Sequence, residues 1–347
     1  MKKFLKLLMV GLLLLLTSGC TDIKPYVAYT VYPIGYLINR IGGDKIEAFS
    51  IQDDNIVQAS NIVDNYQDIL DNSGYFFHIG ELEPYLDLYA KEIIQTGIEE
   101  VDLSTLNAIY KFQRYTLVYV DGKESFIESP YYGSTLFDNV DQNENDLMLW
   151  IDPIGMLSMA KDIYKIMASN YVEAAASFKE NYDKLESDLI SLDASYQNLA
   201  NRLKKENRTI KFVSMSASFG NWQKAYGFQV YPVCLSKYGA LPSDEELEII
   251  KKRIVDDNVK YIAYEPNMTE EMLVLFNQLE DELNLTRVNL NNISSLTASQ
   301  ISNNKDYLSL MYENLSVLEN ITTETINEVE NENVKLLETE ETQEEKE

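Results

Sequence analysis

The chain has a single histidine, His78, among its 347 residues, and this scarcity excludes several kinds of site. A zinc site with two or three imidazoles, the usual pattern for this metal, cannot be built within the chain. No Ser–His–acid arrangement is convincing with one imidazole, and neither a P-loop nor a GxGxxG motif is present. We therefore expect a protein that is not an enzyme.

Cysteine is almost as rare, since Cys234 is the only residue of this type besides Cys20. If Cys20 is modified, as argued below, no intramolecular disulfide can form, and the fold must depend on its apolar core. Basic residues number 29 against 56 acidic ones, for a net charge of −27. This balance argues against nucleic acid as a partner and against a polybasic contact with a membrane.

The first twenty residues resemble the signal of a bacterial lipoprotein. Three lysines precede a leucine-rich run, residues 7–16, which is too short to span a bilayer and is typical of a signal peptide. The sequence LTSGC, ending at Cys20, resembles a lipobox. We predict a signal peptide over 1–19, a lipidated tether over 20–26, and anchoring at the outer face of the cell membrane through acyl chains on Cys20. An ordinary cleaved signal is the alternative.

Strand-like and helix-like segments alternate in the first half of the chain, which predicts a doubly wound parallel sheet. The polar stretch 121–146 interrupts this alternation and is expected to be a surface insertion loop. The expected strands are 27–32, 46–51, 75–79 and 115–120, and the expected helices are 34–41, 57–70 and 82–94.

Residues 171–205 carry apolar side chains at spacings of three and four, which predicts one long helix; a coiled coil is the alternative. A second α/β lobe is expected after it. Its strands are predicted at 210–215, 229–235, 261–264 and 287–290, and its helices at 219–226, 243–256, 269–283 and 305–320. The predicted domains are an N-terminal lobe over 27–165, a linker helix over 166–206, a C-terminal lobe over 207–320 and an acidic disordered tail over 321–347.

Seven stretches in order resemble the zinc and manganese receptors among the substrate-binding lipoproteins of ABC transporters. They are Tyr32-Pro33 with 41–47 (IGGDKIE), 80–86 (GELEPYL), 149–153 (LWIDP), 212–220 with 226–227, 241–243 (LPS), 261–267 (YIAYEPN) and 306–315 (DYLSLMYENL). The resemblance covers roughly 27–320 and implies two α/β lobes bridged by one rigid helix. It also implies an ABC permease as partner.

The resemblance places the family's metal ligands, histidines and carboxylates, at four positions that are changed here. Gln58, Met148, Ser216 and Asn291 occupy them, so the expected metal site is degenerate.

Other residues are candidates for a replaced site in the cleft, namely His78, Tyr32, Met215, Glu265 and Asn292. His78 with Met148 and Met215 would suit Cu(I), whereas Asp53, Asp54 and Glu265 would suit manganese or calcium. The neutral groups, with Tyr32 and Trp222 nearby, would suit a small organic solute.

The first hypothesis is therefore an extracytoplasmic, monomeric receptor of an ABC importer, with zinc or manganese as its possible cargo. The alternatives are a diverged surface lipoprotein that acts as an adhesin or interaction module without metal, and a receptor for Cu(I) or an organic solute. The membrane would be contacted through the lipid anchor only.

Overall fold

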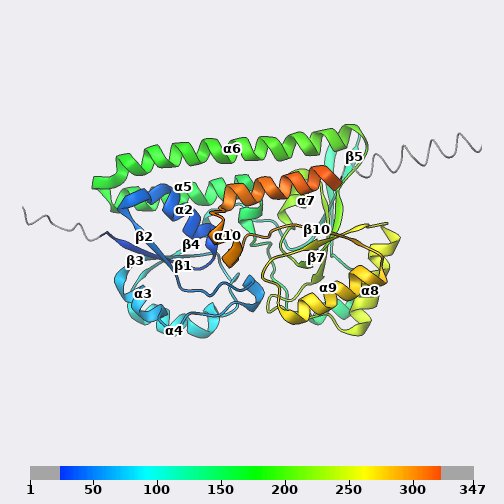
Figure 1. Ribbon diagram of the computed structural model, residues 1–347, viewed down its shortest axis with the longest axis horizontal. Helices are drawn as coiled ribbons and strands as arrows, with labels where there is room; N and C mark the ends of the chain where they lie inside the picture. Colours follow the sequence, from blue (N-terminus) through cyan, green and yellow to red (C-terminus); the bar gives the residue numbers. More distant parts are fainter. Residues whose placement is uncertain (1–23, 322–347) are drawn as a thin grey trace, which may run out of the picture.

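The computed structural model describes residues 24–321, which form two α/β lobes side by side beneath two long helices (Figure 1). The predicted signal peptide, Cys20 and residues 322–347 of the predicted tail lie outside the described residues. Within residues 24–321, no helix is both long and apolar enough to cross a bilayer.

The N-terminal lobe contains a four-stranded parallel sheet in the order β2-β1-β3-β4. This order confirms the doubly wound fold, although β4 was not predicted. The strands are β1 (Tyr26–Tyr29), β2 (Glu47–Ser50), β3 (Ser73–His78) and β4 (Glu99–Asp102), and the helices are α2 (Tyr32–Gly42), α3 (Tyr66–Asn72) and α4 (Leu86–Thr96).

The helix predicted over 57–70 is wrong for its first part. Only a short 3-10 turn, Val57–Ala59, forms before α3 begins at Tyr66. Ile62 instead makes an antiparallel bridge with Gln52, so the chain doubles back beside β2. This bridge keeps residues 52–62 close to the C-terminal end of β2.

The C-terminal lobe contains a second parallel sheet, in the order β10-β9-β7-β8. All four predicted strands and the predicted capping box between Ser243 and Glu246 are confirmed. The strands are β7 (Lys211–Ser216), β8 (Gln229–Cys234), β9 (Tyr261–Tyr264) and β10 (Thr286–Asn289). The helices are α7 (Asn221–Tyr226), α8 (Asp244–Asp256), α9 (Glu270–Glu282), α10 (Ala298–Ser302) and residues 307–321.

The bridge between the lobes is helix α6 (Ala175–Lys205), which contacts α2 and α7 and packs along α5 (Pro153–Asn170). The predicted start of the linker at 166 falls inside α5, and the two helices are separated by a short 3-10 turn. At about 1.5 Å per residue, the 31 residues of α6 span about 46 Å. The apolar seam predicted for it is buried.

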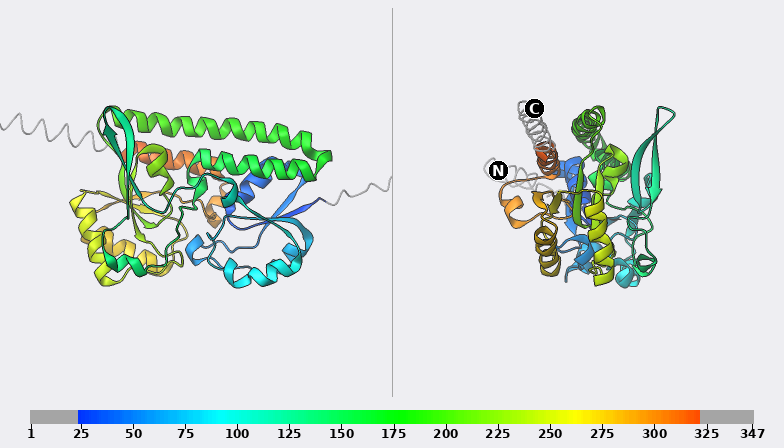
Figure 2. Two further views of the ribbon diagram at one scale, coloured as in Figure 1. Left: turned by 180° about the vertical axis from the view of Figure 1, so that it is seen from behind. Right: turned by 90° about the vertical axis from the view of Figure 1, so that its right-hand side faces the viewer.

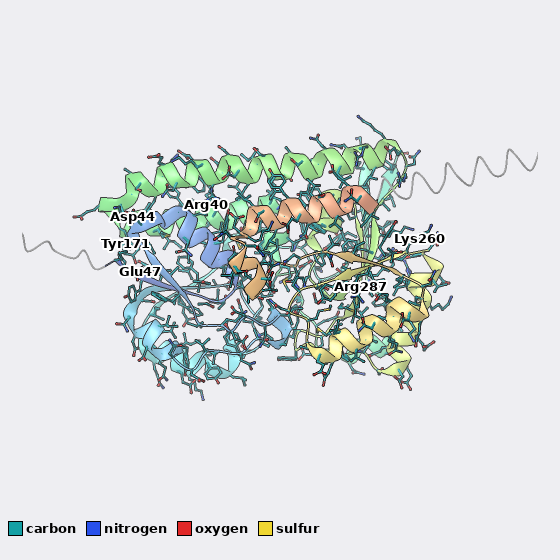
Figure 3. All side chains as sticks on the ribbon, in the orientation of Figure 1. Arg40, Asp44, Glu47, Tyr171, Lys260 and Arg287 are labelled. Carbon is teal, nitrogen blue, oxygen red and sulfur yellow. The ribbon has the colours of Figure 1, made fainter. Side chains whose placement is uncertain are left out.

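Helix α6 is fastened to both lobes. On the N-terminal side, Arg40 of α2 donates to Asp188 at 2.6 Å (Figure 3), and Asn181 donates to the carbonyl of Ile41 at 3.0 Å. On the C-terminal side, the Tyr196 hydroxyl donates to the carbonyl of Met311 at 2.8 Å. A long helix with fixed contacts at both ends leaves little freedom for hinge motion.

The predicted insertion loop contains a strand. β5 (Arg114–Val120) and β6 (Lys123–Ser129) form an antiparallel hairpin that belongs to neither large sheet. Asp121 and Gly122 form its turn with positive φ, 51° and 75°, as a two-residue hairpin loop of this type requires. Since Arg114 pairs with Asp257 at 3.1 Å, this part of the N-terminal half packs on the C-terminal lobe.

Candidate functional site

The two lobes meet where their parallel strands end, and they are joined there by direct hydrogen bonds. The backbone amide of Tyr32, after β1, donates to the carbonyl of Ser294 at 3.1 Å. The Ser295 hydroxyl donates to the carbonyl of Asp54 at 2.9 Å. In open α/β sheets this edge is where ligands bind, so the site must be sought between these contacts.

A cavity of about 20 Å³ lies at this interface. Gln58 and Leu82 line it from the N-terminal lobe, Ala217 and Lys237 line it from the C-terminal lobe, and Met148 lies between them. The volume suffices for one water molecule or one ion. The structure thus brings together Gln58 and Met148, which occupy two of the four changed ligand positions. Ser216, at a third changed position, does not line the cavity, but the next residue, Ala217, does.

Oxygen atoms without hydrogen-bond donors mark the lining of this cavity. Gln58 Oε1 and Asn143 Oδ1 are buried and have no partner. Asp146 also lines the cavity; its side chain is 4% exposed and accepts a hydrogen bond from the amide of Met148 at 3.2 Å. Burial raises the pKa of Asp146 to about 7. Neither Asn143 nor Asp146 was predicted as a site residue, because both lie in the predicted loop.

Lys237 supplies the positive charge at this cavity. Its Nζ lies 3.8 Å from Oδ1 of Asp141 and 5.2 Å from the ring centre of Tyr238. Burial lowers the pKa of Lys237, but Asp141 and nearby groups raise it more, so the net shift is upward. The ammonium is therefore directed towards Asp141, which does not line this cavity.

Glu265 is fully buried and completely engaged by the C-terminal lobe. Its Oε1 accepts from the amide of Ser216 at 3.0 Å, and its Oε2 accepts from Asn292 Nδ2 at 2.9 Å and from the Ser216 hydroxyl. That hydroxyl also contacts the hydroxyl of Ser218. Burial raises the pKa of Glu265 despite these hydrogen bonds. Three predicted candidates thus form one network, which leaves no oxygen of Glu265 without a hydrogen bond.

Glu83 is the counterpart of Glu265 in the N-terminal lobe, and the sequence analysis missed its role. It is 2% exposed and accepts a hydrogen bond from the hydroxyl of Thr30, at the end of β1. Its Oε2 has no partner. Burial raises its pKa to about 8. In both lobes a Glu-Pro pair follows a central strand, a repetition that could have revealed the pairing.

The remaining candidates lie apart from the cavity. His78 stacks on Phe76, with 5.4 Å between the ring centres, whereas Met215 and Trp222 are buried in the core. Asn291 uses its side-chain oxygen to accept from the amide of Ile293 at 2.7 Å. The set proposed for Cu(I) is therefore not assembled.

The set proposed for manganese or calcium is not assembled either. Asp53 accepts from Asn55 Nδ2 at 2.8 Å within its own loop. Across residues 24–321, no group of three or more His, Cys, Asp or Glu side chains is placed to hold a metal ion.

The fold and the interface define a two-lobed solute-binding protein with a rigid helical connection. The sequence model of one family, described as zinc-uptake complex component A, periplasmic, matches residues 27–321. The chain belongs to this family, which confirms the resemblance seen in the sequence. Members are solute-binding proteins and not enzymes.

Two curated relatives are similar over about half of the chain. The zinc-binding lipoprotein AdcA of Streptococcus pneumoniae strain R6 is 24% identical over 180 residues, which cover 52% of this chain and 34% of that protein. AdcA of Streptococcus pyogenes serotype M6, described as a zinc-binding protein, is 25% identical over 173 residues, covering 50% and 32%. The matched region spans about a third of the length of these relatives.

Solved structures show the same fold. The laminin-binding protein Lmb of Streptococcus agalactiae, described as bifunctional with adhesin and metal-transporting activity, has a TM-score of 0.66 at 16% identity, covering 85% of this chain and 98% of that one. The periplasmic zinc-binding protein TroA of Treponema pallidum has a TM-score of 0.64 at 16% identity, covering 85% and 98%.

Proposed function

We propose that this chain is the extracytoplasmic, lipid-anchored receptor of an ABC importer, and that it works as a monomer that delivers a divalent cation to its permease. The observation that carries the proposal is the family match across both lobes and the bridging helix α6. The lipobox-like sequence at Cys20 supports the anchor. The metal-related names of the similar proteins support the class of cargo.

The cargo site we propose is the cavity between the lobes, with oxygen donors in place of imidazoles. Gln58 and Asn143 offer unpartnered carbonyl oxygens there, and Asp146 offers a carboxylate. Oxygen donors suit hard cations such as manganese. A volume of about 20 Å³ is far below the roughly 300 Å³ that a typical organic ligand requires, which disfavours an organic solute.

Removing the carboxylate at position 146 tests this site. We expect Asp146→Asn to weaken manganese binding at least about tenfold, because the exchange removes the only carboxylate among the three proposed donors. Isothermal titration of the chain from residue 21 measures the affinity. Asp138→Asn is the matched control, since Asp138 is exposed and lies outside the cavity lining. Equal affinities in wild type and both variants would remove the proposed site.

A second candidate function is a surface adhesin or interaction module that binds no metal. The observation that favours it is Lys237, which lines the cavity and carries a positive charge that opposes a divalent cation. The direct hydrogen bonds between the lobes would then replace the bridging role of a ligand. Genes for a permease and an ATPase beside the gene for this chain would count against this candidate.

A further inference from the structure

A second hollow, of about 510 Å³, lies away from the lobe interface, between the β5–β6 hairpin, the last turns of α6 and the C-terminal lobe. We call it the basic groove. Five basic and two acidic side chains line it, so its formal charge is +3 in a chain with a net charge of −27. The basic residues are Arg114, Lys204, Arg208, Lys211 and Lys224, and the acidic ones are Glu124 and Asp257.

Aromatic rings and backbone carbonyls hold several of these cations in place. Lys224 Nζ lies 4.6 Å from the ring centres of both Tyr115 and Phe126. Lys211 donates to the carbonyl oxygen of Asp257 at 2.9 Å. Carboxylates also pair with most of these cations, since Lys224 lies 3.6 Å from Glu128 and Arg208 lies 3.2 Å from Glu206, in addition to the pairs with Glu124 and Asp257 in the lining. When Glu128 and Glu206 are counted, five basic and four acidic side chains leave the groove one net positive charge, in a chain that is otherwise strongly acidic.

The described chain ends at the same end of the molecule as this groove, on the other side of α6 from the β5–β6 hairpin (Figure 2). Helix 307–321, the end of α6 and the β5–β6 hairpin lie at the same end of the molecule (Figure 2). The hydroxyl of Tyr261 donates to the carbonyl of Ile321 at 3.5 Å. Tyr261 pairs in register with Phe212, the residue after Lys211 of the groove, and Lys260 lies at this end too (Figure 3).

The residues that follow carry the complementary charge. Residues 322–347 contain ten acidic and two basic side chains. Twenty-six residues at up to about 3.4 Å each reach far beyond the 10–12 Å diameter of a helix such as α6. We propose that this acidic segment binds back into the basic groove of its own chain. The groove is then a site for acidic peptides, and the segment is its resident ligand.

Carbodiimide crosslinking of the chain from residue 21 to 347 tests the proposal, because it joins a lysine to a carboxylate only when they touch. We expect links from Lys204, Lys211 and Lys224 to glutamates of 322–347 within single molecules. These links should disappear at about 1 M salt, where the Debye length is about 3 Å.

Two double variants serve as a matched pair. Lys204→Gln with Lys211→Gln should lower the yield of links from Lys224 several-fold. Lys184→Gln with Lys252→Gln removes the same charge from exposed positions on α6 and α8 and should leave the yield unchanged. Equal yields in both variants, or links spread evenly over lysines outside the groove, would overturn the proposal. Links formed only between molecules, identified with isotopically mixed protein, would assign the groove to a second copy and would also overturn it.

Discussion

Gln58→His combined with Met148→His should raise the zinc affinity of this chain by at least about 100-fold. Both side chains line the same cavity at the lobe interface, so two imidazoles would enter one site. Imidazole is a preferred zinc ligand, and even partners that only orient such ligands change metal affinity by about 10–100-fold. Two directly bound rings should therefore have at least that effect.

Zinc competition against a chelator of known affinity measures the change. Each single histidine variant is the control, because one imidazole beside the oxygen donors of the cavity makes a poor zinc site. If both single variants and the double variant bind zinc as weakly as the wild type, the cavity does not correspond to the metal site of the family.

The stability of the chain should fall as the pH rises from about 4.5 to about 8, and Glu83 should account for much of the fall. Burial raises the pKa of Glu83 from 4.5 to about 8 in the folded chain. The folded state therefore holds this proton at pH values where the unfolded chain has lost it. The contribution is complete below about pH 4.5 and is lost progressively up to about pH 8, with an upper limit of about 5 kcal/mol.

Urea unfolding at a series of pH values checks this expectation. Glu83→Gln should flatten the decline, because the amide cannot ionise. Some slope should remain, since burial raises the pKa of Glu265 in the same direction. Glu81→Gln is the control, because Glu81 is exposed two residues away and should leave the slope unchanged. A steep decline that persists in Glu83→Gln would show that other groups dominate.

Periodicity predicted most of the fold, because apolar spacing reflects burial directly. The seam of α6 and the strand Tyr261–Tyr264 follow from it. The strand at 115–120 was predicted, but its partner β6 was missed although Asp121-Gly122 is a strong turn signal, because β6 is largely exposed and polar. The short 3-10 turn at Val57–Ala59 was missed for a different reason. The turn lies between Gln52 and Ile62, which form an antiparallel bridge, and helix propensity does not encode such a bridge.

The candidate site was predictable only where a motif fixed the register. The motifs placed Gln58 and Met148 at one site, and both line the cavity. They could not show that Glu265 is fully hydrogen-bonded, because this depends on Ser216 at the end of β7 and Asn292 in the loop after β10. Asp146 and Lys237 were missed because they matter only through their place in the lining of the cavity. In an acidic chain, a single charged residue in the sequence does not reveal whether it is buried at an interface.

We propose that this member of the zinc-uptake family has exchanged an imidazole site for oxygen donors between its lobes. The most direct test is the zinc content of the chain from residue 21 to 347 after incubation with zinc and desalting, measured by elemental mass spectrometry. The account predicts well below ~0.1 zinc per chain, because no imidazole or thiolate lines the cavity. About one zinc per chain would contradict it.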